Sequence, residues 1–182
     1  MEIIKTAIED LLIIKPKVFA DARGFFFESY SEKNFQEAGI NIHFCQDNQS
    51  KSGYGVVRGL HYQLNPDSQT KLVSVVQGRV WDIAVDLRKN SATYGQWHGV
   101  ELTEENKLQF LVPQGFAHGF SVLSETAIFS YKCDNFYNPE LERGIMYNDT
   151  DLNIDWKIPA DKALISDKDK KHPLFKDAEK NF

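Results

Sequence analysis

Two histidines on separate strand-like segments are the residues of this chain best suited to chemistry. His61 lies in the segment RGLHYQ, and His118 lies in PQGFAHGF. An imidazole titrates near neutral pH, so a histidine can remove and return a proton without a cofactor. The alternative is that both are hydrogen-bonded structural residues. If both face one pocket that also holds a phenol and an ammonium group, the pattern favours proton-transfer chemistry.

Tyr131 and Lys71 are the candidates for those two further groups. Tyr131 alternates with Phe129 on one face of a predicted strand, and a phenol with a pKa of about 10 can donate a proton to an enolate. Lys71 begins the run KLVSVV, where its ammonium group would stabilise a developing oxyanion. A half-buried barrel tyrosine and a solvated lysine at a strand end are the structural alternatives.

An arginine and a late carboxylate complete the candidate constellation. Arg58 precedes His61 by three positions, so the two lie on opposite faces of a strand unless Gly59 bends or bulges the chain. Such a bulge would place an anion-binding guanidinium beside the imidazole. Asp167 and Asp169 stand in ISDKDKK, and either one would orient His61 if the tail folds back, as in a catalytic triad.

A catalytic metal is not expected. The segments from Gly55 to Gln63 and from Pro113 to His118 are similar to the two signature segments of the cupin superfamily, whose members often bind a metal through histidines and a glutamate. Gln63 stands where the second histidine belongs, and its amide oxygen is a poor substitute for imidazole on a transition metal. Cys45 and Cys133 have no paired metal spacing, and we expect both to be ordinary thiols.

The elements that must position these residues are predicted to be strands. KLVSVV and RVWDIAVDLR flank Gln77-Gly78 and predict a hairpin, with Ile83 on the core face and Asp82 on a wetter face of the second strand. A short helix is predicted between Ser31 and Gly39, and another after Asp167. Further strands are predicted at Val18 to Tyr30, Ile42 to Gln46, Gln96 to Leu102, Leu108 to Val112, Phe116 to Leu123 and Ala127 to Lys132. The fold class is therefore all-β, a sandwich or barrel with a few short peripheral helices.

The length, net charge and apolar content of the chain limit the partners that it can bind. Its 182 residues fit one domain, 1–182. A net charge of -5 gives no field that would attract nucleic acid. We find no signal peptide and no apolar run of membrane-spanning length, so we expect no membrane contact and a cytoplasmic location. The run from Phe25 to Phe27 breaks strand alternation, and we expect some of these rings to line a ligand site or a subunit contact.

Long motifs resemble one family. DARGFFFESY, FCQDNQSKS, VVRGLHYQ, VPQGFAHGFSVLSE, SYKCDNFY and ISDKD are similar, in order and spacing, to the dTDP-4-dehydrorhamnose 3,5-epimerase family. The resemblance implies a cupin-type double-stranded β-helix, or jelly roll, and a homodimer. It also implies inversion of two carbons of dTDP-4-dehydro-6-deoxyglucose, a dTDP-4-keto-6-deoxyhexose, on the route to dTDP-L-rhamnose without a metal or other cofactor.

The resemblance also implies roles for residues. His61 becomes the general base, Asp169 the carboxylate that orients it, Tyr131 the opposing acid and Lys71 the group that favours the enolate oxygen. His118 would lie in the same sugar pocket. Phe26 and Tyr137 are candidates for packing on the thymine or the sugar. The implied substrate contacts are Arg23, Phe26, Glu28, Gln46, Asp47, Asn48, Arg58, His118, Tyr137, Glu142 and Lys168.

Three rival functions remain open at this point. A related enzyme with the same scaffold could invert carbon 3 alone. A non-catalytic module could bind the nucleotide sugar with His61 in a structural role, and a cupin oxygenase would need a metal. One departure from the family pattern is Gln49, where many relatives carry histidine or glutamate.

Overall fold

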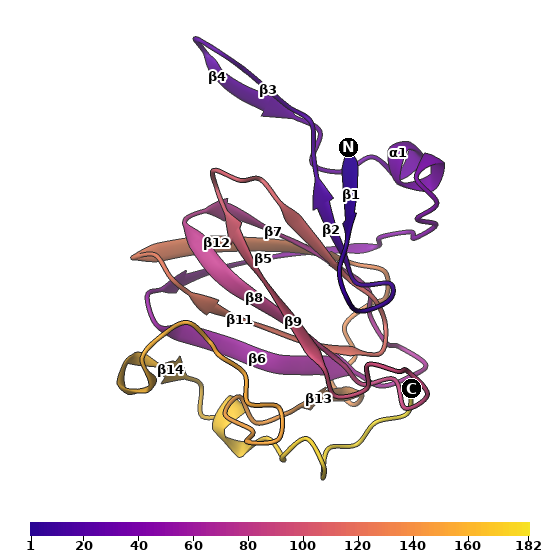
Figure 1. The fold of residues 1–182 in the computed structure, drawn as a ribbon, viewed down its shortest axis with the longest axis vertical. Coiled ribbons are helices and arrows are strands. Elements are labelled where there is room, and N and C mark those ends of the chain that lie inside the picture. Colours follow the sequence, from indigo (N-terminus) through magenta and orange to yellow (C-terminus); the bar gives the residue numbers. More distant parts are fainter.

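A computed structural model describes residues 1–182 and places most strands in two large sheets (Figure 1). The first six-stranded sheet has the order β1 (Glu2–Lys5), β2 (Leu12–Lys15), β10 (Gln109–Val112), β7 (Lys71–Gln77), β12 (Thr126–Cys133) and β5 (Gln46–Gly53). The second has the order β13 (Glu142–Gly144), β6 (Val56–Gln63), β11 (Phe116–Val122), β8 (Arg79–Asp86) and β9 (Trp97–Thr103), with β14 (Leu164–Ile165) parallel to β6. The prediction of an all-β jelly roll is confirmed.

The helices are short and peripheral, as predicted. The helix α1 (Glu32–Glu37) begins after Ser31, whose hydroxyl accepts the backbone N–H of Asn34. Two short 3₁₀ helices follow late in the chain, η1 (Ala160–Lys162) and η2 (Asp169–Lys171). No helix of the chain combines the length and the apolar composition that crossing a membrane requires.

The main core lies between the two sheets. Phe110 and Phe129 of the first sheet pack against Leu102 and Phe120 of the second, and all four side chains are buried. The Phe120 and Phe129 rings are stacked with their centroids 4.2 Å apart. Alternate residues of each strand point into this interior, so polar residues that face it from the two sheets lie close together.

The predicted hairpin at Gln77-Gly78 is wrong. β7 pairs with β10 and β12, whereas β8 pairs with β11 and β9, so the two strands belong to different sheets. Gly78, with φ of +79°, turns the chain from one sheet to the other. The local glycine signal specifies a tight turn, but it cannot distinguish a hairpin from a connection that arches over the core.

The expectation of a wetter face on β8 is also wrong. Asp82, Ala84 and Asp86 are fully buried, as are Ile83 and Val85 on the opposite face. The first set faces the space between the sheets, and the second set packs under residues 141–182, which cross the outer face of the second sheet (Figure 1). A strand covered on both faces loses the exposure pattern that alternation predicts.

The N-terminal boundaries differ from the prediction. The run from Val18 to Tyr30 forms a hairpin of two strands, β3 (Val18–Asp21) and β4 (Gly24–Phe27), which projects from the body of the molecule (Figure 1). The predicted strand from Ile42 to Gln46 is displaced to the polar segment of β5. β5 lies at the edge of its sheet, where polar side chains are tolerated because one edge of the strand faces solvent.

Candidate active site

A cavity of about 270 Å³ lies between the two sheets and gathers most of the predicted chemical groups. Lys71 and Tyr131 reach it from the first sheet, and Arg58, His61 and His118 reach it from the second. Its remaining lining residues are Asn48, Gln49, Ser50, Phe120 and Phe129. The predicted acid and the predicted base therefore stand on opposite walls of one pocket.

A bulge in β6 brings Arg58 and His61 to the same wall, as predicted. His118 of β11 is opposite His61 and Phe120 is opposite Arg58, so two residues of β6 face the single Gly119. Gly59 has φ of +124°, and a Cβ there would lie 2.6 Å from the Gly119 Cα. The close approach of two glycines thus permits the extra residue, which reverses the alternation between Arg58 and His61.

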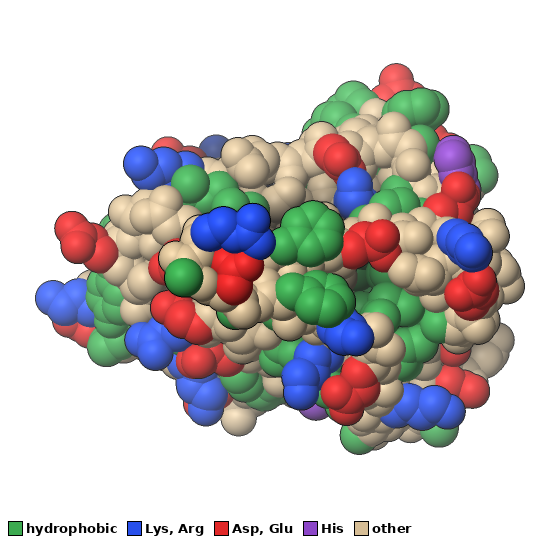
Figure 2. Space-filling model, turned by 90° about the horizontal axis from the view of Figure 1, so that it is seen from above, with side chains coloured by type: hydrophobic (Ala, Val, Ile, Leu, Met, Phe, Trp, Pro, Cys, Tyr) green, Lys and Arg blue, Asp and Glu red, His purple; other side chains and the backbone are tan.

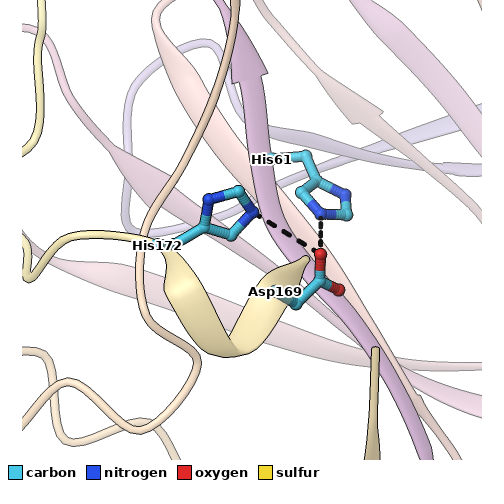
Figure 3. Close-up of side chains that lie close together, drawn as sticks. All are labelled: His61, Asp169 and His172. Atoms are coloured by element: carbon cyan, nitrogen blue, oxygen red, sulfur yellow. Dashed lines mark hydrogen bonds and ion pairs between the residues drawn. The ribbon is translucent and has the colours of Figure 1, made fainter. Parts of the chain in front are cut away.

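Asp169 binds His61 directly. Its Oδ1 lies 2.8 Å from the His61 Nε2 (Figure 3). Its Oδ2 accepts the Gly59 N–H. Burial alone would raise the pKa of Asp169, but the hydrogen bond and charge of His61 outweigh it and lower this pKa to about 2. In the form of His61 that acts as a base, the ionised Asp169 accepts the Nε2–H, which leaves Nδ1 to accept a proton.

The structure also separates the two late carboxylates. The Asp167 side chain is 93% exposed, whereas the Asp169 side chain is 5% exposed. The η2 turn carries Asp169 back onto β6, and Ser166 accepts the Asp169 backbone N–H at 3.0 Å. Asp169 is therefore the carboxylate that folds back, and Asp167 remains in solvent.

Tyr131 and Lys71 form the facing wall. Burial raises the pKa of Tyr131, so the phenol keeps its proton at neutral pH and can donate it. The Lys71 Nζ lies 6.0 Å from the centroid of the Tyr131 ring. Burial lowers the pKa of Lys71, although the nearby Cys133, Glu142 and Asp82 favour the charged form. A cationic group in this pocket would stabilise an oxyanion.

His118 belongs to a second buried pair that the sequence analysis did not find. Its Nε2 lies 2.8 Å from the Asp82 Oδ1, and Asp82 is fully buried. Burial raises the pKa of Asp82, and the opposing effects of His118 and Lys71 do not cancel this rise. The alternation that separates Asp82 from Ile83 placed Asp82 on its own face of the strand, but that face was interpreted as the wetter one.

Several predicted substrate contacts form a hydrogen-bonded cluster whose members, apart from Asn48, do not line this cavity. The Tyr137 hydroxyl donates to the Glu142 Oε2 at 2.8 Å, and the Lys168 Nζ donates to the same oxygen at 2.5 Å. Gln46 joins this cluster, because its Oε1 accepts the Tyr137 backbone N–H and its Nε2 donates to the Asn48 Oδ1. Asp47 points elsewhere and pairs with Lys132 at 3.0 Å.

Three more predicted contacts lie on or beside the N-terminal hairpin, away from the pocket. Arg23 and Phe26 lie on the projecting β3–β4 hairpin, where Arg23 pairs with Asp21 and Phe26 is 70% exposed. Glu28 follows the hairpin and accepts a hydrogen bond from the Asn34 side chain. None of them lines the cavity that holds His61.

Gln63 is committed to structural hydrogen bonds. It is 4% exposed, its Nε2 donates to the Asp67 carbonyl oxygen, and its Oε1 accepts the Asn138 N–H. Its amide is therefore unavailable as a ligand beside His61 and His118, and these residues do not fit the metal set of the cupin signature. Cys45 and Cys133 are free thiols.

Comparisons with known proteins identify close relatives. A sequence profile described as dTDP-4-dehydrorhamnose 3,5-epimerase matches residues 5–177. A protein of that name from Shigella flexneri is 55% identical over 98% of both chains. The crystal structure of such an epimerase from Elizabethkingia anophelis is 61% identical, covers 97% of both chains and superposes with a TM-score of 0.93. A dTDP-6-deoxy-D-glucose-3,5-epimerase from Legionella pneumophila, solved in complex with dTDP-4-keto-L-rhamnose, is 52% identical over 95% of this chain and 92% of its own, with a TM-score of 0.91.

Proposed function

Because the chain belongs to the dTDP-4-dehydrorhamnose 3,5-epimerase family, we propose that His61 and Tyr131 exchange the protons by which it inverts carbons 3 and 5 of its substrate. The enzyme is an isomerase that converts dTDP-4-dehydro-6-deoxy-α-D-glucose to dTDP-4-dehydro-β-L-rhamnose. The observation that carries the assignment is the His61–Asp169 pair on one wall of the pocket, with Tyr131 on the other.

The mechanism follows from the ketone at carbon 4 of the sugar. This ketone makes the hydrogens on carbons 3 and 5 weakly acidic, so one base and one stabilised enolate serve both inversions. His61 removes the proton through Nδ1, and Asp169 stabilises the imidazolium that forms. Tyr131 returns a proton from the opposite wall, which makes the exchange an inversion.

Lys71 stabilises charge in the reaction, and Arg58 binds the substrate. The Lys71 ammonium stabilises the enolate oxygen, an effect of about 3 to 4 kcal/mol for a well-placed donor. Arg58 binds the diphosphate, because a guanidinium donates in a planar fork that matches phosphate oxygens. This binding positions the sugar between the two walls, so that binding energy from the nucleotide lowers the barrier at the sugar.

The remaining substrate contacts come from a second copy of the chain, and the enzyme is a homodimer. Arg23 and Phe26 lie on a hairpin that projects from the body and so cannot serve the pocket of their own chain in this arrangement. Figure 2 looks down on this end of the molecule and shows hydrophobic side chains open to solvent among charged ones. Phe19 and Phe25 of the same hairpin are 54% and 58% exposed. Exposed aromatic rings on a projecting hairpin favour a subunit contact.

We extend the proposal to the chain as a whole. Residues 1–182 act as one domain, because both sheets contribute to the same core and the C-terminal segment packs on the second sheet. A cytoplasmic location stays a prediction from the sequence.

Isotope exchange tests the proposed function. Incubation with the substrate in heavy water places deuterium at carbons 3 and 5, because the protons returned by the enzyme come from solvent-exchanged groups. Label at carbon 3 alone would identify a single epimerase. Absence of label with a folded protein would exclude epimerisation.

A variant of the base separates catalysis from binding. His61→Asn keeps nucleotide binding and loses turnover if His61 is the base. If the protein is only a binding module, the wild type shows no turnover, so the variant has none to lose. If it is a metal-dependent cupin, treatment of the wild type with a chelator abolishes activity.

A further inference from the structure

His172 is a third group at the His61–Asp169 pair, and the mechanism does not use it. Its side chain is 12% exposed, and its ring lies against Gly144, where a Cβ would overlap the His172 imidazole. The His61 and His172 ring centroids are 5.6 Å apart in an edge-to-face arrangement. The buried His172 Nε2 has no hydrogen-bond partner, yet it faces the Asp169 Oδ1 at 3.5 Å (Figure 3).

The three side chains present a convergent set of metal ligands. One ligand atom each from His61, Asp169 and His172 lies within 4.8 Å of the other two. Zn²⁺ takes nitrogen and oxygen ligands at about 2.0 to 2.2 Å in a tetrahedron, so neighbouring ligand atoms stand about 3.4 Å apart. The separation of 3.5 Å between Asp169 and His172 already matches this spacing. The 2.8 Å between His61 and Asp169 needs to widen by roughly half an ångström, which is small for side chains on a turn.

The donor types and the surrounding charges also fit a zinc-class ion. Two imidazoles and one carboxylate form a donor set typical of Zn²⁺, whereas Mg²⁺ and Ca²⁺ prefer oxygen alone. Asp169 is ionised, and its neighbouring cation Lys168 is paired with Glu142. Lys170 pairs with Asp167. Arg58 is a positive charge that lowers the affinity, but its Nε is directed to the Ser52 hydroxyl.

Two of the three ligands also face a second space, which lies beside the substrate pocket. His61 and Asp169 line this open depression with Arg58, Ser166 and Lys168, on the side of β6 where β14 runs. His172 does not line it. The catalytic groups Lys71 and Tyr131 do not line this depression. His61 thus stands between two spaces, one for the sugar and one open to solvent.

We propose that His61, Asp169 and His172 bind Zn²⁺ and that this ion switches off the catalytic base. The ion bonds to the lone pair of the His61 Nε2, and the proton held there moves to Nδ1 through solvent. An imidazole with a metal on one nitrogen and a proton on the other has no lone pair left to take a proton from carbon. Inhibition therefore rests on the proposed role of His61, whereas binding of the ion does not.

Calorimetry tests the site without substrate. Titration of ZnCl₂ into chelator-treated full-length protein gives one ion per chain with a micromolar or tighter Kd. His172→Phe keeps a ring against Gly144 and removes the ligand nitrogen, so its affinity falls by about 100-fold or more, since even an outer-shell partner is worth 10- to 100-fold. His43→Asn is the matched control, because the His43 side chain is 81% exposed and is not one of the three proposed ligands. This variant leaves the affinity for Zn²⁺ unchanged.

Two results would overturn the site. One is the absence of stoichiometric binding by the wild-type protein, and the other is wild-type affinity in His172→Phe. If His172→Phe fails to fold, as judged by thermal melting, His172→Asn decides the same question with a smaller side chain.

Kinetics test the consequence. Zn²⁺ lowers kcat and leaves the KM for the dTDP-sugar unchanged, and an excess of chelator restores the rate. His172→Phe needs a Zn²⁺ concentration about 100-fold higher for the same inhibition. A rise in KM with constant kcat would place the ion in the substrate pocket and contradict the inference. If the protein turns over substrate but does not bind zinc, the zinc site is wrong and the proposed function stands. If it binds zinc but does not turn over substrate, the proposed function is wrong and the zinc site stands.

Discussion

Asp169 accepts the His61 Nε2–H and so decides which ring nitrogen carries the proton. Asp169→Asn keeps the size of the side chain but replaces the anion that stabilises the imidazolium. We expect kcat to fall by about 10³- to 10⁴-fold, as when a triad carboxylate becomes an amide. Steady-state kinetics measure it, and Asp167→Asn is the matched control, since that side chain is exposed. A loss below about fivefold in Asp169→Asn would contradict the assigned role.

The same carboxylate couples stability to pH. Its pKa is about 2 in the folded protein against an ordinary value of 3.8. Because the folded value is depressed, the stabilisation of about 2 kcal/mol is complete above the unfolded pKa and is lost as pH falls through the folded pKa. Urea unfolding at about pH 5 and about pH 3 measures it, and the wild type loses about 1 kcal/mol more than Asp169→Asn over that interval. Equal losses in both proteins would contradict the linkage.

Residue types and spacing predicted the groups with visible chemistry. His61, His118, Tyr131, Lys71 and Arg58 do share a pocket. Asp82 and His172 were missed for different reasons. Asp82 stands on a strand face that was interpreted as the wetter one, whereas it is buried. His172 stands in a charged tail, and only the tertiary fold brings that tail back to β6. Short-range patterns do not encode which distant segments meet.

At the scale of the elements, the bulge in β6 holds the base in register. Gly59→Ala places a Cβ 2.8 Å from the His118 carbonyl oxygen at a residue with φ of +124°. We expect a loss of about 3 kcal/mol in the free energy of unfolding and a fall in kcat, because the backbone shift displaces His61. Gly53→Ala is the control, since its nearest contact would be an ordinary 3.7 Å. Urea unfolding and steady-state kinetics report both effects, and a Gly59→Ala protein as stable as Gly53→Ala would refute the argument.

Features of the elements that depend only on neighbouring residues were predicted correctly. The helix cap at Ser31 and the bulge at Gly59 follow from residue chemistry, and both are present. The turn at Gly78 and the two faces of β8 depend on which sheet each strand joins and on what covers it. Long-range pairing and the C-terminal cover decide those features, so no local pattern could have settled them.

At the scale of the whole molecule, the pocket of one chain is complete in its acid and base but not in its predicted nucleotide contacts. His61 and Tyr131 face each other across the core, while Arg23 stands on the projecting hairpin. The sequence resemblance predicted both the residues and a homodimer. The resemblance did not say which of these residues contact the substrate in the pocket of their own chain and which contact it in the pocket of the partner chain. Both chains of a symmetric dimer have the same sequence, so the sequence alone does not distinguish the two cases.

Mixing two inactive variants tests this division of the site. Arg23→Ala removes the cation from the hairpin, and His61→Asn removes the base from the pocket. When both are unfolded together and refolded, random pairing makes half of the dimers mixed, and each mixed dimer has one site with wild-type His61 and the partner's wild-type Arg23. We expect about one quarter of wild-type activity at subsaturating substrate. If the hairpin served its own pocket, no mixed dimer would contain an intact site and the activity would equal the mean of the two variants.

Mixing either variant with itself through the same cycle controls for refolding losses, and size-exclusion chromatography shows whether the mixed protein is a dimer. A monomer with full activity would remove the need for a second chain, because the Arg23 hairpin would then have no pocket other than its own to reach.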